Sequence, residues 1–124
     1  MKIVKITTDP IDPEAIRRPL EAPHLGGVVV FAGEVRSITG NESTVFLNYE
    51  AYEEMALKQM NEIADEAENK WNANVGLVHR IGKLLPGEIA VVTVAACAHR
   101  AEAFECCKFL IDSLKANVTI WKND

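Results

Sequence analysis

The segment PGEIAVVTVAAC, residues 86–97, determines the fold class that the sequence predicts. Pro86-Gly87 is typical of a turn, and Ile89 to Cys97 is apolar at nearly every position, odd and even. A strand that is apolar on both faces belongs in the middle of a sheet that is covered on both sides. Before the turn, Val75, Leu77 and Ile81 alternate with other residues and predict a partner strand in a hairpin.

Two longer segments have the period of an amphipathic helix. In residues 52–71, apolar side chains recur at steps of three and four: Tyr52, Met55, Ala56, Met60, Ile63, Ala64, Ala67 and Trp71. In residues 100–115, one face is expected to carry the buried stripe Phe104, Cys107, Ile111 and Leu114. These segments are the two main helices that we expect to cover the sheet.

The rest of the chain supplies shorter elements. Lys2 to Thr7, residues 26–35, residues 43–50 and residues 118–121 are expected strands. Asp12 can cap a brief helix that has Pro13 at its first position and ends near Pro19. The predicted order is β-α-β-β-α-β-β-α-β. Hairpins between helices favour a single α+β domain over residues 1–124, with a mixed or antiparallel sheet.

Composition excludes several classes of protein. The chain has 124 residues, of which 48% are hydrophobic and 25% charged, enough for one core of ordinary size. Its formal net charge of −5 would repel nucleic acid phosphates. No apolar run approaches the roughly 20 residues of a bilayer-spanning helix, and no signal peptide begins the chain. We therefore expect a cytoplasmic protein that binds neither nucleic acid nor membrane.

The three cysteines do not have the spacing of a disulfide framework or of a zinc site. Cys97, Cys106 and Cys107 are odd in number, two of them are adjacent, and no CxxC pair accompanies a histidine. We expect reduced, buried thiols that behave as small apolar side chains, and no metal site.

No common nucleotide-binding or hydrolase motif is present, so the candidates for chemistry are cations beside loops and helix ends. They are Arg36, His99, Arg100, Lys115 and Lys122. These cations also have ordinary structural explanations that need no bound ligand. Lys115 would stabilise a helix C-terminus, and Arg36 would be solvated in a hairpin loop. His99-Arg100 opens a helix, where free N–H groups favour a bound anion. His79 falls on the apolar side of its strand, as a hydrogen-bonded core histidine would.

Five segments of the chain, taken in order and with their spacing, resemble a known family. They are Phe31-Ala32-Gly33-Glu34-Val35-Arg36, Tyr49-Glu50-Ala51-Tyr52 with Met55, His79-Arg80-Ile81-Gly82 with Pro86-Gly87-Glu88, Ala98-His99-Arg100 with Ala103-Phe104, and Leu114-Lys115 with Ile120-Trp121-Lys122. Together they span nearly the whole chain. The sequence resembles the large, catalytic subunit of molybdopterin synthase.

The resemblance implies a fold, a reaction and partners. The fold would be α/β-hammerhead-like, and the enzyme would transfer two sulfurs to cyclic pyranopterin monophosphate, giving the dithiolene of molybdopterin. The sulfur donor would be the C-terminal Gly-Gly thiocarboxylate of a small ubiquitin-like subunit, and no cofactor would be bound permanently. The large subunit would be a homodimer with one small subunit at each end, a heterotetramer.

The resemblance also implies which residues form the site. Lys115 and Lys122 match the two active-site lysines, and His99 and Arg100 match an anion-binding pair that reaches the site across the dimer interface. The substrate-binding positions would be Glu34, Val35, Arg36, His99, Arg100, Lys115, Lys122, Asn123 and Asp124. Such cations would offset the charge of the phosphate, the thiocarboxylate and the released carboxylate. Lys115 would carry a proton or form a covalent adduct with the partner's carboxyl end.

The chain departs from the family pattern in places, which keeps two alternative functions open. Ser37 and Thr119 stand where the family often has Asn and Pro, and the charged tail with which family members usually continue is absent after Asp124. One alternative is a non-catalytic module that binds a ubiquitin-like partner or a pterin anion. The other is a persulfide sulfurtransferase that uses Cys106 or Cys107.

Overall fold

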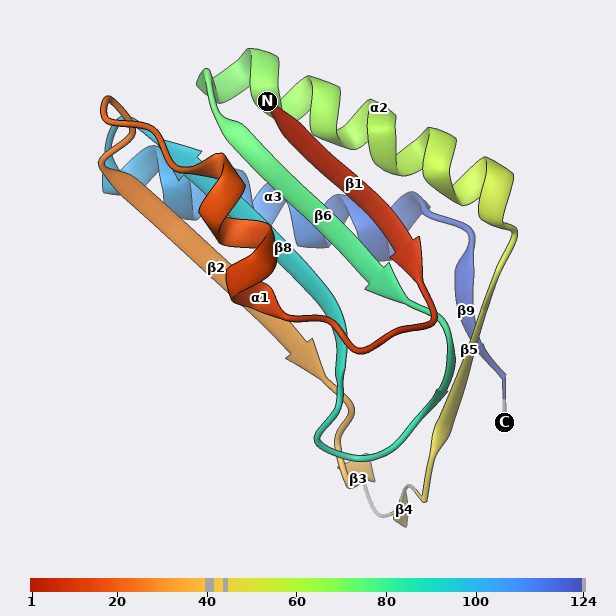
Figure 1. The fold of residues 1–124 in the computed structure, drawn as a ribbon. Coiled ribbons are helices and arrows are strands. Elements are labelled where there is room, and N and C mark those ends of the chain that lie inside the picture. The colour runs from red at the N-terminus through yellow and green to blue at the C-terminus, as the bar shows by residue number, and fades with distance from the viewer. Residues whose placement is uncertain (40–41, 44, 124) are drawn as a thin grey trace.

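The computed structural model describes residues 1–39, 42–43 and 45–123 of the chain (Figure 1). Its elements are β1 (Lys2–Thr7), α1 (Pro13–Arg17), the 3-10 helix η1 (Arg18–Leu20), β2 (Gly27–Glu34), β3 (Ile38–Thr39), β4 (Glu42–Ser43), β5 (Leu47–Ala51), α2 (Glu53–Trp71), β6 (Asn74–Arg80), β7 (Gly82–Leu84), β8 (Ile89–Cys97), α3 (Arg100–Asn117) and β9 (Ile120–Asn123). The α+β class and all nine predicted elements are confirmed. The short strands β3, β4 and β7 are additional.

The main sheet has four strands in the order β1-β6-β8-β2. Its centre is β8, in which every residue after Ile89 is buried, as the apolar sequence predicts. β6 and β2 flank β8 in antiparallel pairings, so the predicted hairpin of β6 and β8 is confirmed. β1 pairs in parallel with β6, which makes the sheet mixed.

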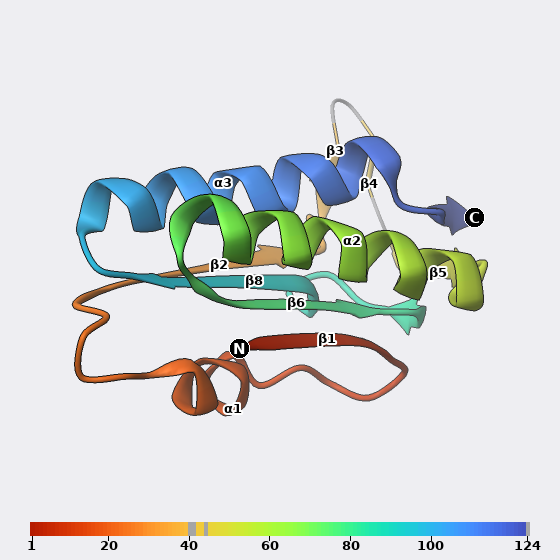
Figure 2. The same ribbon diagram turned by 90° about the horizontal axis from the view of Figure 1, so that it is seen from above.

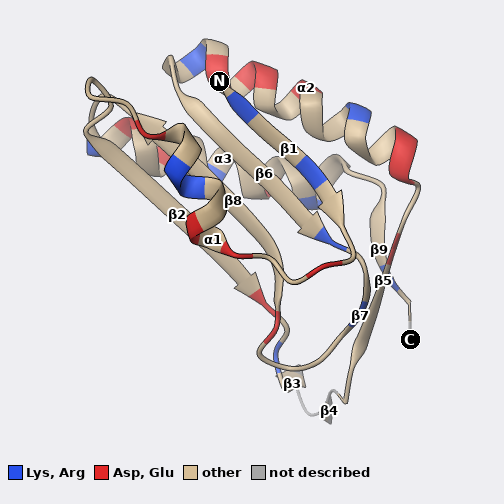
Figure 3. Cartoon of the chain, in the orientation of Figure 1, with Lys and Arg blue, Asp and Glu red and all other residues tan. Residues whose placement is uncertain are grey.

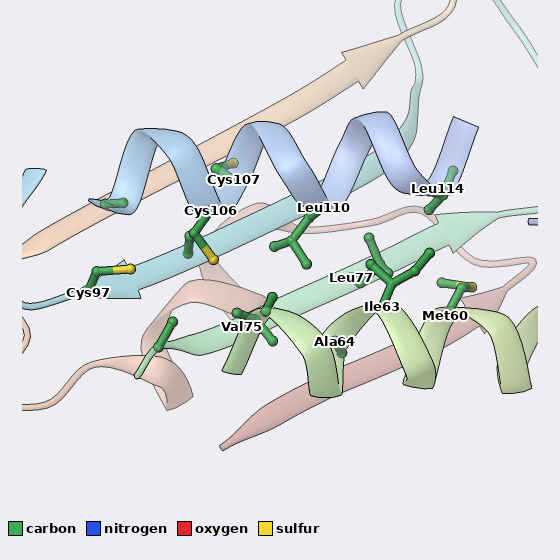
Figure 4. Close-up of a cluster of buried hydrophobic side chains, with 14 of the residues drawn as sticks. Met60, Ile63, Ala64, Val75, Leu77, Cys97, Cys106, Cys107, Leu110 and Leu114 are labelled. Carbon is green, nitrogen blue, oxygen red and sulfur yellow. The ribbon is translucent and has the colours of Figure 1, made fainter. Parts of the chain in front are cut away.

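Helices cover both faces of this sheet (Figure 2). α2 and α3 lie side by side on one face, and the largest core cluster fills the space beneath them with side chains such as Met60, Leu77 and Leu110 (Figure 4). α1 and η1 cover the other face, where Ile16 and Leu20 pack in a second cluster. The Asp12 carboxylate accepts a hydrogen bond from the backbone N–H of Glu14 at 3.0 Å, so the predicted cap is confirmed.

Periodicity placed three apolar side chains on buried faces, and the structure places them at the surface. Phe104 is 62% exposed, because α3 turns Ala103, Cys106, Cys107, Leu110 and Leu114 toward the core. Tyr52 is 67% exposed, because it precedes α2, and its backbone N–H donates to Thr119 O. Met55, in the first turn of α2, is 41% exposed.

Within the described residues, no helix is both long and apolar enough to cross a membrane.

β2 and β5 belong to different sheets, so the segment that includes Arg36 is not the hairpin loop that the sequence predicts. β5 is the centre of a smaller sheet in the order β7-β5-β9. β2 leaves the main sheet at a register shift between Gly33 and Glu34, and a bulge of this kind redirects a strand. The chain then passes through the short β3–β4 pair before it returns as β5.

Candidate functional site

A cavity of about 410 Å³ opens where the two sheets meet the C-terminal end of α3. Its wall is formed by Phe31, Ala32, Gly33, Glu34, Val35, Arg36, Leu47, Tyr49, His79, Ala90, Val91, Lys115 and Lys122. Five of these are predicted site residues, and they come from three separate parts of the chain. Figure 3 shows basic positions at this end of the molecule, on β9 and on the segment that follows β2.

Lys115 and Lys122 reach one cavity because the chain turns sharply between them. Lys115 lies in the last turn of α3, which ends when the backbone N–H of Val118 donates to Leu114 O. The backbone N–H and the hydroxyl of Thr119 both donate to Gln59 Oε1 of α2, at 2.9 and 3.2 Å. This anchor directs the chain into β9.

Pairing of β9 with β5 then fixes the direction of the second lysine. In this antiparallel pair, Lys122 stands directly opposite Tyr49. Directly opposed residues project from the same face of a sheet, and alternate residues project from opposite faces. Lys122 therefore shares the cavity face with Tyr49, whereas Trp121 and Asn123 belong to the other face.

Val35 anchors the segment that carries Glu34 and Arg36. Its side chain is 4% exposed and packs with Leu84 and Ala90. Its backbone is tied to the turn after β7: Val35 N–H donates to Glu88 O at 2.9 Å, and Gly87 N–H donates to Val35 O at 2.8 Å. With Val35 held on both sides, its exposed neighbours Glu34 and Arg36 remain at the cavity.

An ion pair stiffens that same turn. The Arg80 guanidinium nitrogen Nη1 lies 3.0 Å from Glu88 Oε2, and Glu88 Oε1 accepts a hydrogen bond from the backbone N–H of Leu85 at 2.7 Å. Both contacts hold the pKa of the Glu88 carboxyl below its usual range. Gly87 has a φ of 89°, in the left-handed region that favours glycine. The Pro86-Gly87-Glu88 motif thus supports the cavity wall.

His79 and Tyr49 also line the cavity, although reasoning from the sequence did not assign them to the site. The prediction that His79 is a hydrogen-bonded core histidine is confirmed, since it is 5% exposed and bonded to Arg80 O. Its ring meets Tyr49 edge-on, with centroids 5.1 Å apart. The only signal was that both residues fall in segments that resemble the family.

Burial determines the protonation of both rings. Desolvation is the main cause that lowers the pKa of His79 to about 4; the nearby charge of Lys115 lowers it further, and the hydrogen bond to Arg80 opposes the shift. Burial also raises the pKa of Tyr49. Near neutral pH both side chains are uncharged.

The charges around the cavity suit an anion. Arg36, Lys115 and Lys122 supply three positive charges against the single carboxylate of Glu34, in a chain whose net charge is −5. A local cation cluster in a recess attracts and holds an anion even when the whole protein is acidic. Across the described ranges, no group of three or more His, Cys, Asp or Glu side chains is arranged to hold a metal ion.

The remaining predicted site residues lie elsewhere in the single chain. His99 and Arg100 are at the N-terminus of α3, about 22 Å from Lys115 at the helical rise per residue. The amide of Asn123 donates to Glu50 Oε1 at 2.9 Å, on the face of β9 away from the cavity. Asp124 falls outside the described residues.

The cysteines are buried in the core and do not line the cavity (Figure 4). Burial raises the pKa of all three thiols, Cys97, Cys106 and Cys107. Cys107 Sγ also lies 3.2 Å from the hydroxyl of Thr93 within the core. A persulfide mechanism needs an accessible thiolate, so this environment argues against it.

Comparison with known proteins gives one consistent family. Residues 6–117 match the model of the family described as MoaE protein. The molybdopterin synthase catalytic subunit of Nostoc sp. is 41% identical over 121 residues, which are 96% of this chain and 73% of that protein. The X-ray structure of molybdopterin synthase from Staphylococcus aureus matches with a TM-score of 0.90 and 39% identity, over 94% of this chain and 86% of that one.

A more distant solved structure shares the fold. It is described as a protein–protein complex of subunits 1 and 2 of molybdopterin-converting factor from Helicobacter pylori 26695. It matches with a TM-score of 0.82 and 24% identity, over 98% of this chain and 83% of that one.

Proposed function

This chain belongs to the MoaE family, and on that premise we propose that it is the catalytic subunit of a molybdopterin synthase. It transfers sulfur from the C-terminal thiocarboxylate of a small ubiquitin-like subunit to cyclic pyranopterin monophosphate, forming the dithiolene of molybdopterin. One observation carries the proposal: Arg36, Lys115 and Lys122 line a single cavity although they are distant in sequence.

The cavity suits a reaction between anions. The substrate phosphate, the thiocarboxylate sulfur and the released carboxylate all carry negative charge, and they would repel one another in the absence of cations. In our proposal Arg36 holds the substrate, and Lys115 and Lys122 stabilise the charge that moves during sulfur transfer. Lys115 also carries a proton to or from the reacting groups, or joins the partner's carboxyl end covalently.

We further propose that two copies of the chain complete each other's sites. β2 is an edge strand of the main sheet, and its surface is apolar: Val28 and Val30 are 37% and 38% exposed, and Phe31 is 40% exposed. Phe104 of α3, 62% exposed, lines the same surface beside Phe31. An exposed edge strand with apolar side chains favours pairing with another strand.

The ends of β2 indicate how such a pair would be arranged. Gly27, at its start, lies against the backbone of His99 and Arg100, while Glu34, at its end, lies in the cavity wall. These ends are about 24 Å apart along a strand. A two-fold axis near the middle of β2 would place the partner's β2 antiparallel to it, so that the first residues of one strand meet the last residues of the other. His99 and Arg100 of one copy would then face the cavity of the other.

The buried thiols favour this function over a persulfide sulfurtransferase, since the sulfur would arrive on the partner subunit. Free thiols at Cys97, Cys106 and Cys107 agree with a reducing compartment, and we place the reaction in the cytoplasm. The cation cluster would also suit a non-catalytic module that binds a pterin anion, so formation of product is what distinguishes that module from the enzyme.

Sulfur transfer can be tested directly. The purified chain is incubated with cyclic pyranopterin monophosphate and a thiocarboxylated small subunit, and the dithiolene product is assayed. The control is the same small subunit with an ordinary C-terminal carboxylate, which brings no sulfur and should give no product. Binding of the pyranopterin without product from the thiocarboxylated partner would contradict the proposal and support the non-catalytic module.

A further inference from the structure

His79 is the histidine in the cavity wall. A hydrogen bond to the backbone determines which of its two ring nitrogens carries the proton. Its Nδ1 lies 2.7 Å from the carbonyl oxygen of Arg80. A carbonyl oxygen only accepts, so Nδ1 carries the proton. In the uncharged ring the second nitrogen, Nε2, is then a hydrogen-bond acceptor.

The Nε2 atom is available to a ligand. Within the described part of the chain, His79 makes a hydrogen bond through Nδ1, and none is found for Nε2. Every fully buried side-chain nitrogen or oxygen atom in that part has a partner, so Nε2 is not fully buried. Nε2 therefore touches open space, and the open space next to His79 is the cavity. The edge-on contact with Tyr49, 5.1 Å between centroids, holds the ring in this orientation.

The other polar groups around the cavity differ from His79 in kind. Arg36 after β2, Lys115 of α3 and Lys122 of β9 only donate hydrogen bonds and carry positive charge, while Glu34 at the end of β2 is an anion. Burial keeps the pKa of His79 at about 4, so its ring stays uncharged beside those cations at neutral pH. The wall thus offers cations for an anionic group and, in the His79 ring, a fixed neutral acceptor for a different part of the ligand. The Tyr49 hydroxyl is also neutral, but it can donate as well as accept.

We infer that His79 is a specificity-determining residue, whose Nε2 accepts a hydrogen bond from an N–H or O–H donor on the ring system of the bound ligand. This inference rests on the proposed function, in which that ring system is the pyranopterin. The cations bind the phosphate, and His79 distinguishes the pterin portion from other phosphate-bearing molecules. A site built to accept from a donor discriminates against analogues that lack it, because a desolvated polar group is left unpaired.

Two substitutions separate the two nitrogens of the ring. His79→Asn places an amide near the position of Nδ1, so it keeps the donor to Arg80 O but does not reach the cavity. His79→Gln places its amide near the position of Nε2, so it restores an acceptor in the cavity and gives up the contact with Arg80. Thermal unfolding of both variants, compared with the wild type, establishes that each is folded.

Binding is measured with two probes, cyclic pyranopterin monophosphate and inorganic phosphate. We expect His79→Asn to weaken pyranopterin binding about tenfold and His79→Gln to recover most of that loss. Phosphate binding should change less than about twofold in both, since the cations are intact. Equal losses in the two variants, or a wild-type affinity in His79→Asn, would overturn the inference.

The experiment separates this inference from the proposed function. If the wild-type protein does not bind the pyranopterin at all, the proposed function fails. If the wild type binds it and forms product but the asparagine variant is unchanged, only the role of His79 fails. In turnover assays, His79→Asn should raise KM more than it lowers kcat if His79 binds the ligand. If His79 acted through Lys115 instead, the substitution would mainly lower kcat.

Discussion

Lys115 occupies a position that would stabilise any helix. It lies in the last turn of α3, where a positive charge interacts favourably with the negative end of the helix dipole. The same side chain also lines the cavity with Lys122 and Arg36. Stabilisation of the helix would by itself explain a lysine at this position in the sequence. Its place in the cavity wall is what indicates a second role, in the site.

Substitution of Lys115 separates these roles. Lys115→Ala should cost about 0.3–1 kcal/mol of unfolding free energy and lower the single-turnover rate of product formation by about 10² or more. Lys115→Arg keeps the charge but cannot readily release a proton, so it should restore substrate binding better than rate. Lys58→Ala, an exposed lysine of α2 away from the cavity, is the control. Near-normal rates in both Lys115 variants would remove this residue from the mechanism.

Burial of His79 also predicts how stability depends on pH. Its pKa is about 4 in the folded chain and near 6.5 in the unfolded chain, so between these values the unfolded chain binds more protons. Stability from this residue is fully present above about pH 6.5 and is lost as the pH falls toward about 4. The full loss is about 3 kcal/mol at the usual value per pH unit.

Urea unfolding at a series of pH values between 4 and 7 measures this loss. His79→Asn should flatten the curve over that range, because the variant has no group there to protonate. His24→Asn removes an exposed histidine and should keep the wild-type slope. A wild-type slope in His79→Asn would show that another group is responsible.

At the scale of elements, α3 has predicted site residues at both ends: His99 and Arg100 at its N-terminus, and Lys115 in its last turn. Its N-terminus with His99 and Arg100 can approach β2 closely because Gly27 has no side chain. A Cβ atom at Gly27 would lie 2.9 Å from Arg100 N and from His99 C, closer than real Cβ contacts. The neighbouring Gly26 is less constrained, since a Cβ atom there would meet only Ala98 O, at 3.4 Å.

Gly27→Ala should therefore displace the start of α3. We expect it to reduce the unfolding free energy by about 1–3 kcal/mol, the usual cost of overpacking. The neighbouring Gly26→Ala should cost clearly less, and it controls for the general effect of a methyl group on glycine. Urea unfolding of the two variants measures the difference. Equal effects would mean that the close approach to α3 does not constrain this strand.

At the scale of the whole molecule, the cavity of a single chain is lined by only some of the predicted site residues. Lys115 and Lys122 share one cavity, while His99 and Arg100 lie at the other end of α3. Either the second pair is not used or a second copy supplies it. The edge position of β2 and its exposed apolar side chains favour the second copy.

Mixing two inactive variants tests whether sites are shared. In a dimer of one Lys115→Ala chain and one Arg100→Ala chain, one site lacks both residues and the other is intact. Random exchange makes about half the dimers mixed, so activity should return to about a quarter of the wild-type value. Lys115→Ala mixed with Lys122→Ala should recover nothing, since those residues belong to one chain's cavity. No recovery in the first mixture, with subunit exchange demonstrated, would contradict the shared site.

Local patterns were enough to predict the α+β order, the central strand β8 and the helices. They succeed because apolar periodicity and turn residues reflect the immediate neighbours in the chain. The same reasoning misplaced Phe104, Tyr52 and Met55, since a periodic pattern gives a helix its apolar face but does not say how far the neighbouring elements extend. It also placed Arg36 in a hairpin, because no local signal reports that β2 and β5 join different sheets.

The sequence by itself determined the apolar core and the buried thiols, and through resemblance it implied that Arg36, Lys115 and Lys122 form one site. Only the tertiary structure showed the cavity that Arg36, Lys115 and Lys122 line, and that His99 and Arg100 of the same chain lie at the far end of α3. The tertiary structure also showed that His79, a buried residue, is part of the wall of that cavity. The physical reason is that a site depends on which distant segments pack together, and long-range pairings such as β5 with β9 leave no periodic trace in the residues that they join.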